Sequence, residues 1–447
     1  MSLPCRWRDE ALAHPTRAIV LASLTLRCLT SFLLLLVFSL NPSFDASAAT
    51  LSHPVSPYLQ PFVRWDTVYF VNIALEGYTQ EQRAAFMPGL PGLMRAGGEG
   101  IRWLRGGKGA ASGDDVVLAG MTATAAAAIA AAVVLHRLTV RLFPRRSAFA
   151  LTTALLFLLA PGRPTLHAVP YTEPFAALFT FLGMLLFYKN RDATAAVAWA
   201  LGTTMRAQGV VLGLGFFGWK WVLRRTWDGT SSGRLQRLAT GIPVFAALSL
   251  LSSLPFLAFQ RYVYTLFCSE PSSLRPWCTE GLGFSYGWIQ SEYWDVGLFR
   301  YWTLLQLPNF LLAAPVLALS LAASYSFYRS NLAFTLRSTL PFLPLSLAPS
   351  APPRHANPSE PLSNPSSPSA TLALIPLIHL HTLLTLLLLT TAHVQIVLRV
   401  CVTNPVVWWY AAELVCSGSR WGRRWVVYCV VWGTVATGLW AVFLPPA

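Results

Sequence analysis

Long apolar runs recur along this chain and constrain its fold more than any other feature. They include Ile19–Leu40, Val116–Leu135, Ala239–Leu257, Leu304–Leu321, Leu372–Thr391 and Trp425–Leu444. A helix needs about 20 mostly apolar residues to cross a bilayer, because every backbone N–H and C=O must be bonded within the segment there. Only 11% of the residues are charged and 54% are hydrophobic. The sequence therefore predicts an all-α polytopic membrane protein.

The positive charge of the chain fixes the expected topology. The net charge is +15, and Lys and Arg cluster in short loops between the apolar runs. Such loops are typical of cytosolic anchors, so we favour this interpretation over nucleic-acid binding. Arg6, Arg8 and Arg17 precede the first run and place the N-terminus in the cytosol. Alternation from there predicts about eleven spans, with every later basic loop on the cytosolic side.

This topology divides the chain into a membrane part and loops. We expect residues 1–447 to form a single multi-pass domain. Two large loops, 41–115 and 261–301, are predicted on the lumenal side. Residues 348–369 are rich in Pro, Ser, Ala and Asn and cannot bury enough apolar surface to fold, so we predict a disordered cytosolic insert there.

On this topology, polar side chains gather on the lumenal side. They include Arg64, Asp66, Glu76, Glu173, Glu292, Asp295, His393 and Gln395. Acidic residues number only 18 in the whole chain, so their grouping favours one face of the membrane as the working face. The alternative is that loops simply collect polar residues.

The motif RWD in the first loop offers the strongest catalytic candidate. Asp66 could accept a proton from a sugar hydroxyl, Trp65 could stack on a sugar ring, and Arg64 is a neighbouring cation. The alternative is an interfacial ion pair with a Trp anchor, which is common in membrane proteins. The spacing alone does not separate the two interpretations.

A second acidic residue and an intramembrane arginine follow. Glu173 in PYTEPF begins a predicted helix, where a carboxylate also complements the helix dipole. We therefore rank it behind Asp66 as a catalytic residue. Arg206 in TTMRAQG lies between two apolar segments, and a charge in that position is costly unless it is used. It could bind a phosphate or pair with a carboxylate.

The later lumenal segments add binding candidates. The 261–301 loop is dense in aromatic residues, as a sugar- or lipid-binding surface would be, and it includes Trp277. Cys268 and Cys278 lie in the same loop, and we predict a structural disulfide there, because the lumen is oxidising. The remaining candidates for substrate binding are Gln306, His393, Gln395 and Arg399. A single His near an interface is more often structural than catalytic.

Several signals of soluble enzymes are absent from the sequence. There is no Walker P-loop, no GxGxxG followed by an acidic residue after a strand, no HExxH and no GxSxG. The seven cysteines contain no CxxC pair, so neither a zinc nor a redox site is expected. We expect no metal and no cofactor, and a donor that resides in the membrane fits better than a nucleotide.

These segments resemble the GPI mannosyltransferase 2 family. The family's first lumenal loop is similar to RWDTVYFVNIALEGYTQEQRAAFMPGLPG. The similarity continues in order through PYTEPFAALFTFLGM, TTMRAQGVV, RPWC, YWDVGLFRYWTLLQLPNFLLAAPVL and HVQIVLRV. The N-terminal region and residues 329–369 carry no match.

The resemblance implies a GT-C architecture, a multi-helix membrane fold with large lumenal loops. It implies transfer of the second mannose, in α-1,6 linkage, to the glycosylphosphatidylinositol (GPI) precursor from dolichyl-phosphate-mannose in the lumen of the endoplasmic reticulum. An acidic residue of the first lumenal loop is the usual base in such enzymes, which points to Asp66; Glu173 is the next candidate. Arg64, Arg206 and Arg399 are candidates to stabilise the leaving phosphate. The resemblance also allows a small membrane partner subunit.

Two other functions remain open. The first is a different mannosyltransferase of the same fold, acting on N-glycan precursors or on protein hydroxyls, since fold alone does not define the acceptor. The second is a transporter or lipid scramblase, which predicts inverted repeats and polar residues at the bilayer midplane. The sequence shows no repeat by eye and places its polar residues mostly on one face, so the transporter ranks lower.

Overall fold

The computed structural model confirms an all-α architecture. It describes residues 9–41, 43–44, 50–224, 231–269, 275–279, 283–340, 362, 368–442 and 444. Within these ranges there is no β-strand. Five helical segments are long and apolar enough to cross a membrane: Pro15–Leu40, Gly113–Leu142, Leu235–Phe267, Leu304–Thr339 and Ala370–Thr390. Shorter apolar helices accompany them, and the number of eleven spans stays a prediction.

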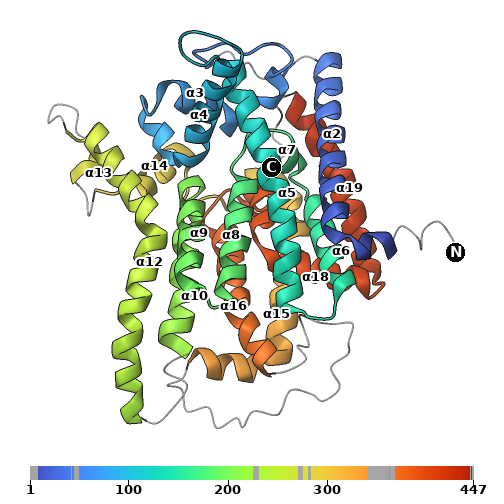
Figure 1. Cartoon of the computed structure of the whole chain (residues 1–447), viewed down its shortest axis with the longest axis vertical. Helices are drawn as coiled ribbons and strands as arrows, with labels where there is room; N and C mark the ends of the chain where they lie inside the picture. The colour runs from blue at the N-terminus through green and yellow to red at the C-terminus, as the bar shows by residue number, and fades with distance from the viewer. Residues whose placement is uncertain are drawn as a thin grey trace.

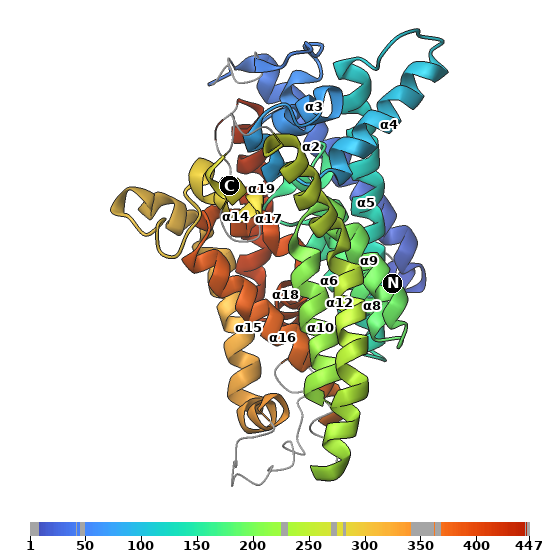
Figure 2. The same cartoon turned by 90° about the vertical axis from the view of Figure 1, so that its left-hand side faces the viewer.

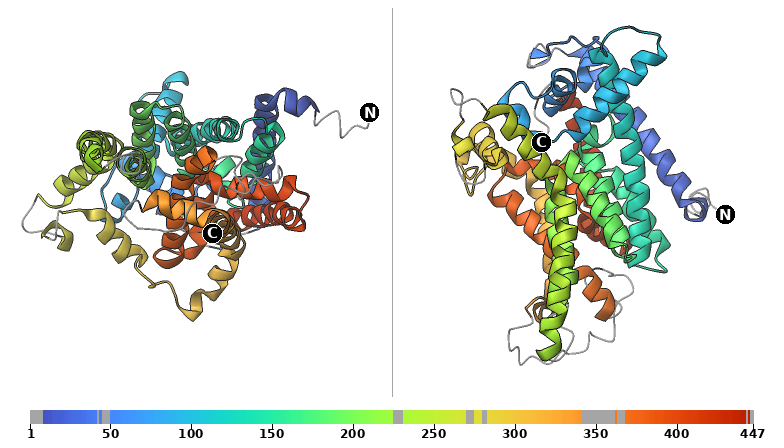
Figure 3. Two further views of the ribbon diagram at one scale, coloured as in Figure 1. Left: turned by 90° about the horizontal axis from the view of Figure 1, so that it is seen from below. Right: turned by 60° about the vertical axis from the view of Figure 1, so that its left-hand side comes forward.

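The bundle is built from helices in the order that the apolar runs predict. They are α2 (Pro15–Leu40), α5 (Gly113–Leu142), α6 (Ser147–Leu158), α8 (Glu173–Phe187), α9 (Asp192–Met205), α10 (Gln208–Gly218), α12 (Ser231–Phe267), α15 (Leu307–Thr339), α16 (Pro368–Thr390), α18 (Pro405–Cys416) and α19 (Arg420–Ala441). Figure 3 shows α2 and α12 at opposite edges of this bundle. Both helices expose leucines outward, as lipid-facing helices do.

Short helices complete the fold at one end of the bundle. They are α3 (Asp66–Glu76), α4 (Gly89–Leu104), α7 (Arg163–His167), α13 (Pro276–Thr279), α14 (Ser285–Trp294) and α17 (Val397–Val400). Figures 1 and 2 show α3 and α4 at the end of the bundle opposite the start of α12. The segment predicted as the loop 41–115 is therefore largely folded.

The interior is packed by large aromatic side chains. Trp199, Trp408 and Trp409 are fully buried together with phenylalanines of several helices. The close approach of α8 and α9 requires a glycine, because a Cβ at Gly183 would overlap the indole of Trp199. Tight packing of this kind fixes the helices whose ends carry the polar site.

Local signals explain where the site-bearing helices begin. Ser112 caps α5: its hydroxyl accepts from the Asp115 backbone N–H at 3.2 Å, and the Asp115 carboxylate accepts from the Ser112 N–H at 3.1 Å. Asp115 also pairs with Arg105 at 2.7 Å, which ties the end of α4 to the start of α5. The end of α4 is thus fixed to the long helix α5.

Two other predictions concern the loops. Cys268 and Cys278 form a disulfide, which closes the end of α12 against α13. Most of the predicted insert at 348–369 lies outside the described residues, and α16 begins within it at Pro368. Helix α15 continues to Thr339 with a break in helical geometry at Asn331.

Candidate active site

Asp66 stands at the first position of α3, after an unusual backbone turn. The preceding residue, Trp65, has φ 53° and ψ −129°, a region that bulky side chains rarely adopt. Such strain persists only where the surrounding structure holds it, and it concentrates at functional sites. The turn sets the Asp66 side chain at the helix N-terminus, where a carboxylate is favourable.

Asp66 is paired with an arginine that the sequence places more than three hundred residues away. The Arg399 guanidinium lies 3.0 Å from the Asp66 carboxylate. It also donates to the Tyr171 hydroxyl at 2.8 Å and lies over the Tyr171 ring at 5.2 Å. Burial raises the pKa of the Tyr171 hydroxyl well above its ordinary value; the Arg399 charge opposes this rise, whereas Asp66 and Glu173 add to it. Tyr171 therefore stays neutral beside the ion pair.

Glu173 connects this pair to a second arginine. Its Oε1 lies 2.9 Å from Arg206 Nη1 and 3.6 Å from Arg399 Nε. Two carboxylates and two guanidinium groups thus form one cluster with balanced formal charge. Buried charges are tolerated when they are paired in this way.

The two carboxylates differ in access. The side chain of Asp66 is 30% exposed, whereas that of Glu173 is 1% exposed. Of these two carboxylates, Asp66 lines the adjoining cavity and Glu173 does not; Arg206 and Arg399 line it as well. A base must reach the proton that it removes. The geometry therefore suits Asp66 for direct chemistry and Glu173 for holding the two arginines.

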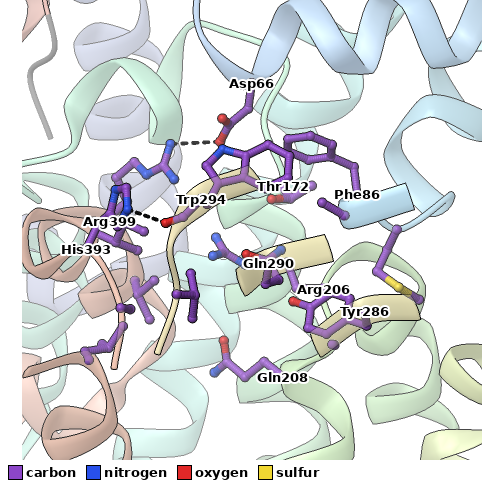
Figure 4. Close-up of a pocket in the computed structure, with 18 of the residues that line it drawn as sticks. Asp66, Phe86, Thr172, Arg206, Gln208, Tyr286, Gln290, Trp294, His393 and Arg399 are labelled. Atoms are coloured by element: carbon purple, nitrogen blue, oxygen red, sulfur yellow. Dashed lines mark hydrogen bonds and ion pairs between the residues drawn. The ribbon is translucent and has the colours of Figure 1, made fainter. Parts of the chain in front are cut away.

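The charged cluster lies against a cavity of about 360 Å³, which Asp66, Arg206 and Arg399 line. Figure 4 shows its labelled walls, with Asp66 and Arg399 on one side and Gln208 at the other. Around the charged groups lie the polar side chains of Thr172, Gln208 and Gln290. Another wall is apolar and comes from α16 through Leu384, Leu387 and Leu388. The cavity can therefore hold a charged or polar group beside an apolar chain.

Aromatic residues close the cavity between α3 and α14. Phe86, Tyr286 and Trp294 line it, and Phe86 packs edge-on against Trp294 at 5.8 Å. His393 Nε2 lies 2.7 Å from the Trp294 carbonyl oxygen. The His393 ring stacks on Tyr301 at 4.6 Å. His393 thus lines the cavity and fixes the end of α14 beside it.

Gln306 and Gln395 do not line the cavity. They belong to a hydrogen-bond network around Tyr301, the ring on which His393 stacks. The Tyr301 hydroxyl donates to Gln395 Oε1 at 2.9 Å. Asn309 Nδ2 lies 2.8 Å from the same hydroxyl and 2.6 Å from Gln306 Oε1. The side-chain oxygens of both glutamines accept hydrogen bonds in this network, so substrate binding by Gln306 and Gln395 stays a prediction.

Three more predicted substrate contacts lie elsewhere. Arg64 is buried and directed to Ser43 and to the Ala441 carbonyl, so it joins the first loop to α19. Trp65 packs within the apolar cluster around α3 and does not line the cavity. Trp277 is fully buried and donates its indole N–H to Glu81. Tertiary packing uses these side chains, so their position does not favour sugar contacts, and that role stays a prediction.

Sequence reasoning missed several lining residues. Gln208 lies two positions after Arg206, and its Nε2 donates to Thr403 at 3.0 Å. Tyr286, Gln290 and Trp294 lie on one helix, α14, within the aromatic-rich loop that the sequence analysis identified. The aromatic density identified the segment. Which of its side chains face the cavity depends on how α14 docks, and no local pattern reveals that.

The described residues contain no group of three or more His, Cys, Asp or Glu side chains arranged to hold a metal ion. The site is instead an ion-paired cluster of carboxylates and guanidinium groups. A carboxylate can take a proton from a hydroxyl, and guanidinium groups stabilise developing negative charge on phosphate. The arrangement therefore fits transfer of a group between a phosphate and a hydroxyl.

Comparison with known proteins agrees with this chemistry. Residues 18–447 match the sequence model of a family described as "Mannosyltransferase (PIG-V)". A "GPI mannosyltransferase 2" of Cryptococcus neoformans is 34% identical, over 94% of this chain and 97% of the relative. Another of Yarrowia lipolytica is 28% identical, over 93% and 96%. A "GPI alpha-1,6-mannosyltransferase 2" of Cricetulus griseus is 32% identical, over 84% and 77%.

Proposed function

The chain belongs to the PIG-V family of mannosyltransferases, and we propose that it adds the second mannose, in α-1,6 linkage, to the GPI precursor. The proposed donor is dolichyl-phosphate-mannose, and the proposed location is the lumenal side of the endoplasmic reticulum membrane. The family and the names of the relatives support a mannosyltransferase of GPI-anchor biosynthesis. The small membrane partner subunit that the resemblance allows is part of the proposal.

One observation carries the donor assignment: a charged cluster adjoins an apolar wall within one cavity. Arg206 and Arg399 can face a phosphate at one end, and Leu384, Leu387 and Leu388 of α16 can contact an isoprenoid chain at the other. A nucleotide sugar would not need the apolar wall. A lipid-linked phosphosugar needs both halves of the cavity.

The reaction proceeds as a single displacement. The acceptor hydroxyl attacks the anomeric carbon of the β-linked mannosyl phosphate while the bond from that carbon to the phosphate oxygen breaks. Asp66 takes the hydroxyl proton, and dolichyl phosphate leaves with the electron pair. Its added negative charge is stabilised by Arg206 and Arg399. Because attack occurs from the face opposite the leaving group, the product is α-linked.

A phosphate leaving group explains why one accessible carboxylate is enough. Inverting glycosidases use two carboxyl groups, since they activate water and also protonate a poor leaving group. A phosphate monoester leaves without protonation when cations stabilise it. Glu173 is then free to hold Arg206 and Arg399 in place, as its buried position suggests.

The proposal is tested by in vitro transfer from labelled dolichyl-phosphate-mannose to the one-mannose GPI precursor. Asp66→Asn keeps the shape of the side chain but removes the base, so we expect the transfer rate to fall by about a hundredfold or more. Thermal stability of the purified variant is the control, because Arg399 retains Glu173 as a partner. Near-normal transfer by a stably folded Asp66→Asn would rule out Asp66 as the base.

A cellular measurement separates this function from the other mannosyltransferases of the same fold. Cells that lack the protein should accumulate the one-mannose GPI precursor. Accumulation of a truncated dolichol-linked oligosaccharide would instead assign the protein to N-glycan synthesis.

A further inference from the structure

A second groove, of about 470 Å³, lies between α3, α4 and α12. It is mainly apolar, and its wall includes Ile73, Tyr78, Gly92, Arg95, Phe259 and Tyr262. Arg95 and Tyr262 are exposed at its rim. Helix α12 also exposes Leu250, Leu254 and Leu266 along its length, so the groove opens beside a lipid-facing helix.

The groove and the catalytic cavity lie along the same helix. Asp66 is at the first position of α3, whereas Ile73, Gly77 and Tyr78 line the groove at its far end. At 1.5 Å per residue, Asp66 and Gly77 are about 16 Å apart along the axis. The loop after α3 joins the two sites: Met87 lines the cavity, and its neighbour Pro88 lines the groove.

A hydrogen bond also connects the two sites. The Tyr78 hydroxyl donates to the Phe86 carbonyl oxygen at 2.9 Å. Phe86 stacks on Tyr69 at 4.8 Å and lines the catalytic cavity. An occupant of the groove would therefore contact a side chain that holds the cavity wall.

The two lipid substrates of the proposed reaction place their phosphates differently. In the donor, the phosphate is bonded to the carbon that is transferred, so it must lie beside Arg206 and Arg399, next to Asp66. In the acceptor, several sugar rings separate the lipid phosphate from the reacting hydroxyl. Its phosphate and acyl chains must therefore lie well away from Asp66, and the groove is an apolar site at such a distance. Arg95 lies at its rim; its guanidinium is more than half exposed and pairs with Glu99 at 3.5 Å, a surface contact that leaves its other N–H groups able to face a phosphate.

We propose that the α3–α4–α12 groove binds the phosphatidylinositol part of the acceptor glycolipid, with Arg95 facing its phosphate. This inference rests on the proposed function. The glycan would extend along α3 toward Asp66, while the donor chain occupies the wall of α16. The two lipids thus enter from different sides of α3.

Gly92 allows a sharp test, because a Cβ added there meets no atom within 4 Å and a larger side chain enters the groove. We expect Gly92→Trp to raise KM for the intact one-mannose GPI precursor by about tenfold. KM for dolichyl-phosphate-mannose, and transfer to the deacylated precursor, should not change. The matched control is Gly100→Trp on the same helix, which is equally open and lies outside the groove.

A second variant tests the charge without filling the groove. Arg95 is exposed, so Arg95→Gln should fold normally, and we expect it to raise KM for the intact acceptor by about fivefold. Unchanged acceptor KM in both variants, or a rise in donor KM instead, would overturn the inference. Failure of the wild-type protein to mannosylate the GPI precursor is a separate result, which would refute the proposed function itself.

Discussion

At the scale of single residues, two carboxylates that the sequence offers for one role occupy different environments. Asp66 reaches the cavity, and Glu173 is enclosed between Arg206 and Arg399. The sequence ranks Asp66 first because Glu173 has a structural role at a helix start and because the family resemblance points to the first loop. The structure adds a physical reason, which is access. It also shows that the two interpretations of Arg206, phosphate binding and pairing with a carboxylate, are compatible, because a guanidinium can make both contacts.

Glu173→Gln should therefore affect stability as well as activity. The substitution leaves two largely buried guanidinium groups without their shared carboxylate, and breaking a buried pair in this way costs about 3 kcal/mol. We expect a clear fall in the melting temperature of the purified protein and a loss of transfer. Glu173→Asp, which keeps the charge, should recover part of the stability.

The contrast with Asp66→Asn makes this prediction specific. Asp66→Asn should lose transfer activity with little change in melting temperature, because the Asp66 side chain is partly exposed. If Glu173→Gln instead retained wild-type stability and lost only the catalytic rate, Glu173 would have to act on the substrate directly.

At the scale of elements, the sequence predicts the helices better than their contacts. The apolar runs locate α2, α5, α12, α15 and α16, because a bilayer demands a minimum apolar length. The segments that build the site are short, such as α14 and α17. From the sequence alone, the polar side chains of these segments could face the cavity or face away from it. Which of the two occurs depends on how the segments dock against α3 and α15. For this reason the sequence offers His393, Gln306 and Gln395 alike as substrate-binding candidates, whereas in the structure His393 lines the cavity and the two glutamines do not.

His393→Phe tests the link between α14 and the segment before α17. Phenylalanine can keep the stacking on Tyr301 but loses the hydrogen bond to the Trp294 carbonyl. One hydrogen bond contributes about 0.5–1.5 kcal/mol, so we expect kcat/KM to fall by up to about tenfold, mainly through KM. Steady-state kinetics on both substrates measures how the fall is divided between KM and kcat. A fall in kcat of a hundredfold or more would mean that His393 contacts the reacting atoms.

At the scale of the whole molecule, the catalytic end and the basic loops lie apart. Figure 1 shows α3 and α4 at one end of the bundle, with the lower end of α8 toward the other. The positive-inside rule assigns the basic end to the cytosol. The sidedness stays a prediction from charge. The pairing of Asp66 with Arg399 could not be predicted from the sequence, because it depends on how the segment around Arg399 packs against α3.

Cysteine labelling can test this sidedness with two matched positions. Lys108 is exposed in the loop between α4 and α5, and Lys189 is exposed at the end of α8. In a protein whose other free cysteines are replaced by serine, Lys189→Cys should react with a membrane-impermeant maleimide in sealed microsomes. Lys108→Cys should react only after the membrane is permeabilised. Equal labelling of both positions in sealed vesicles would contradict the predicted topology, on which the proposed lumenal placement of Asp66 depends.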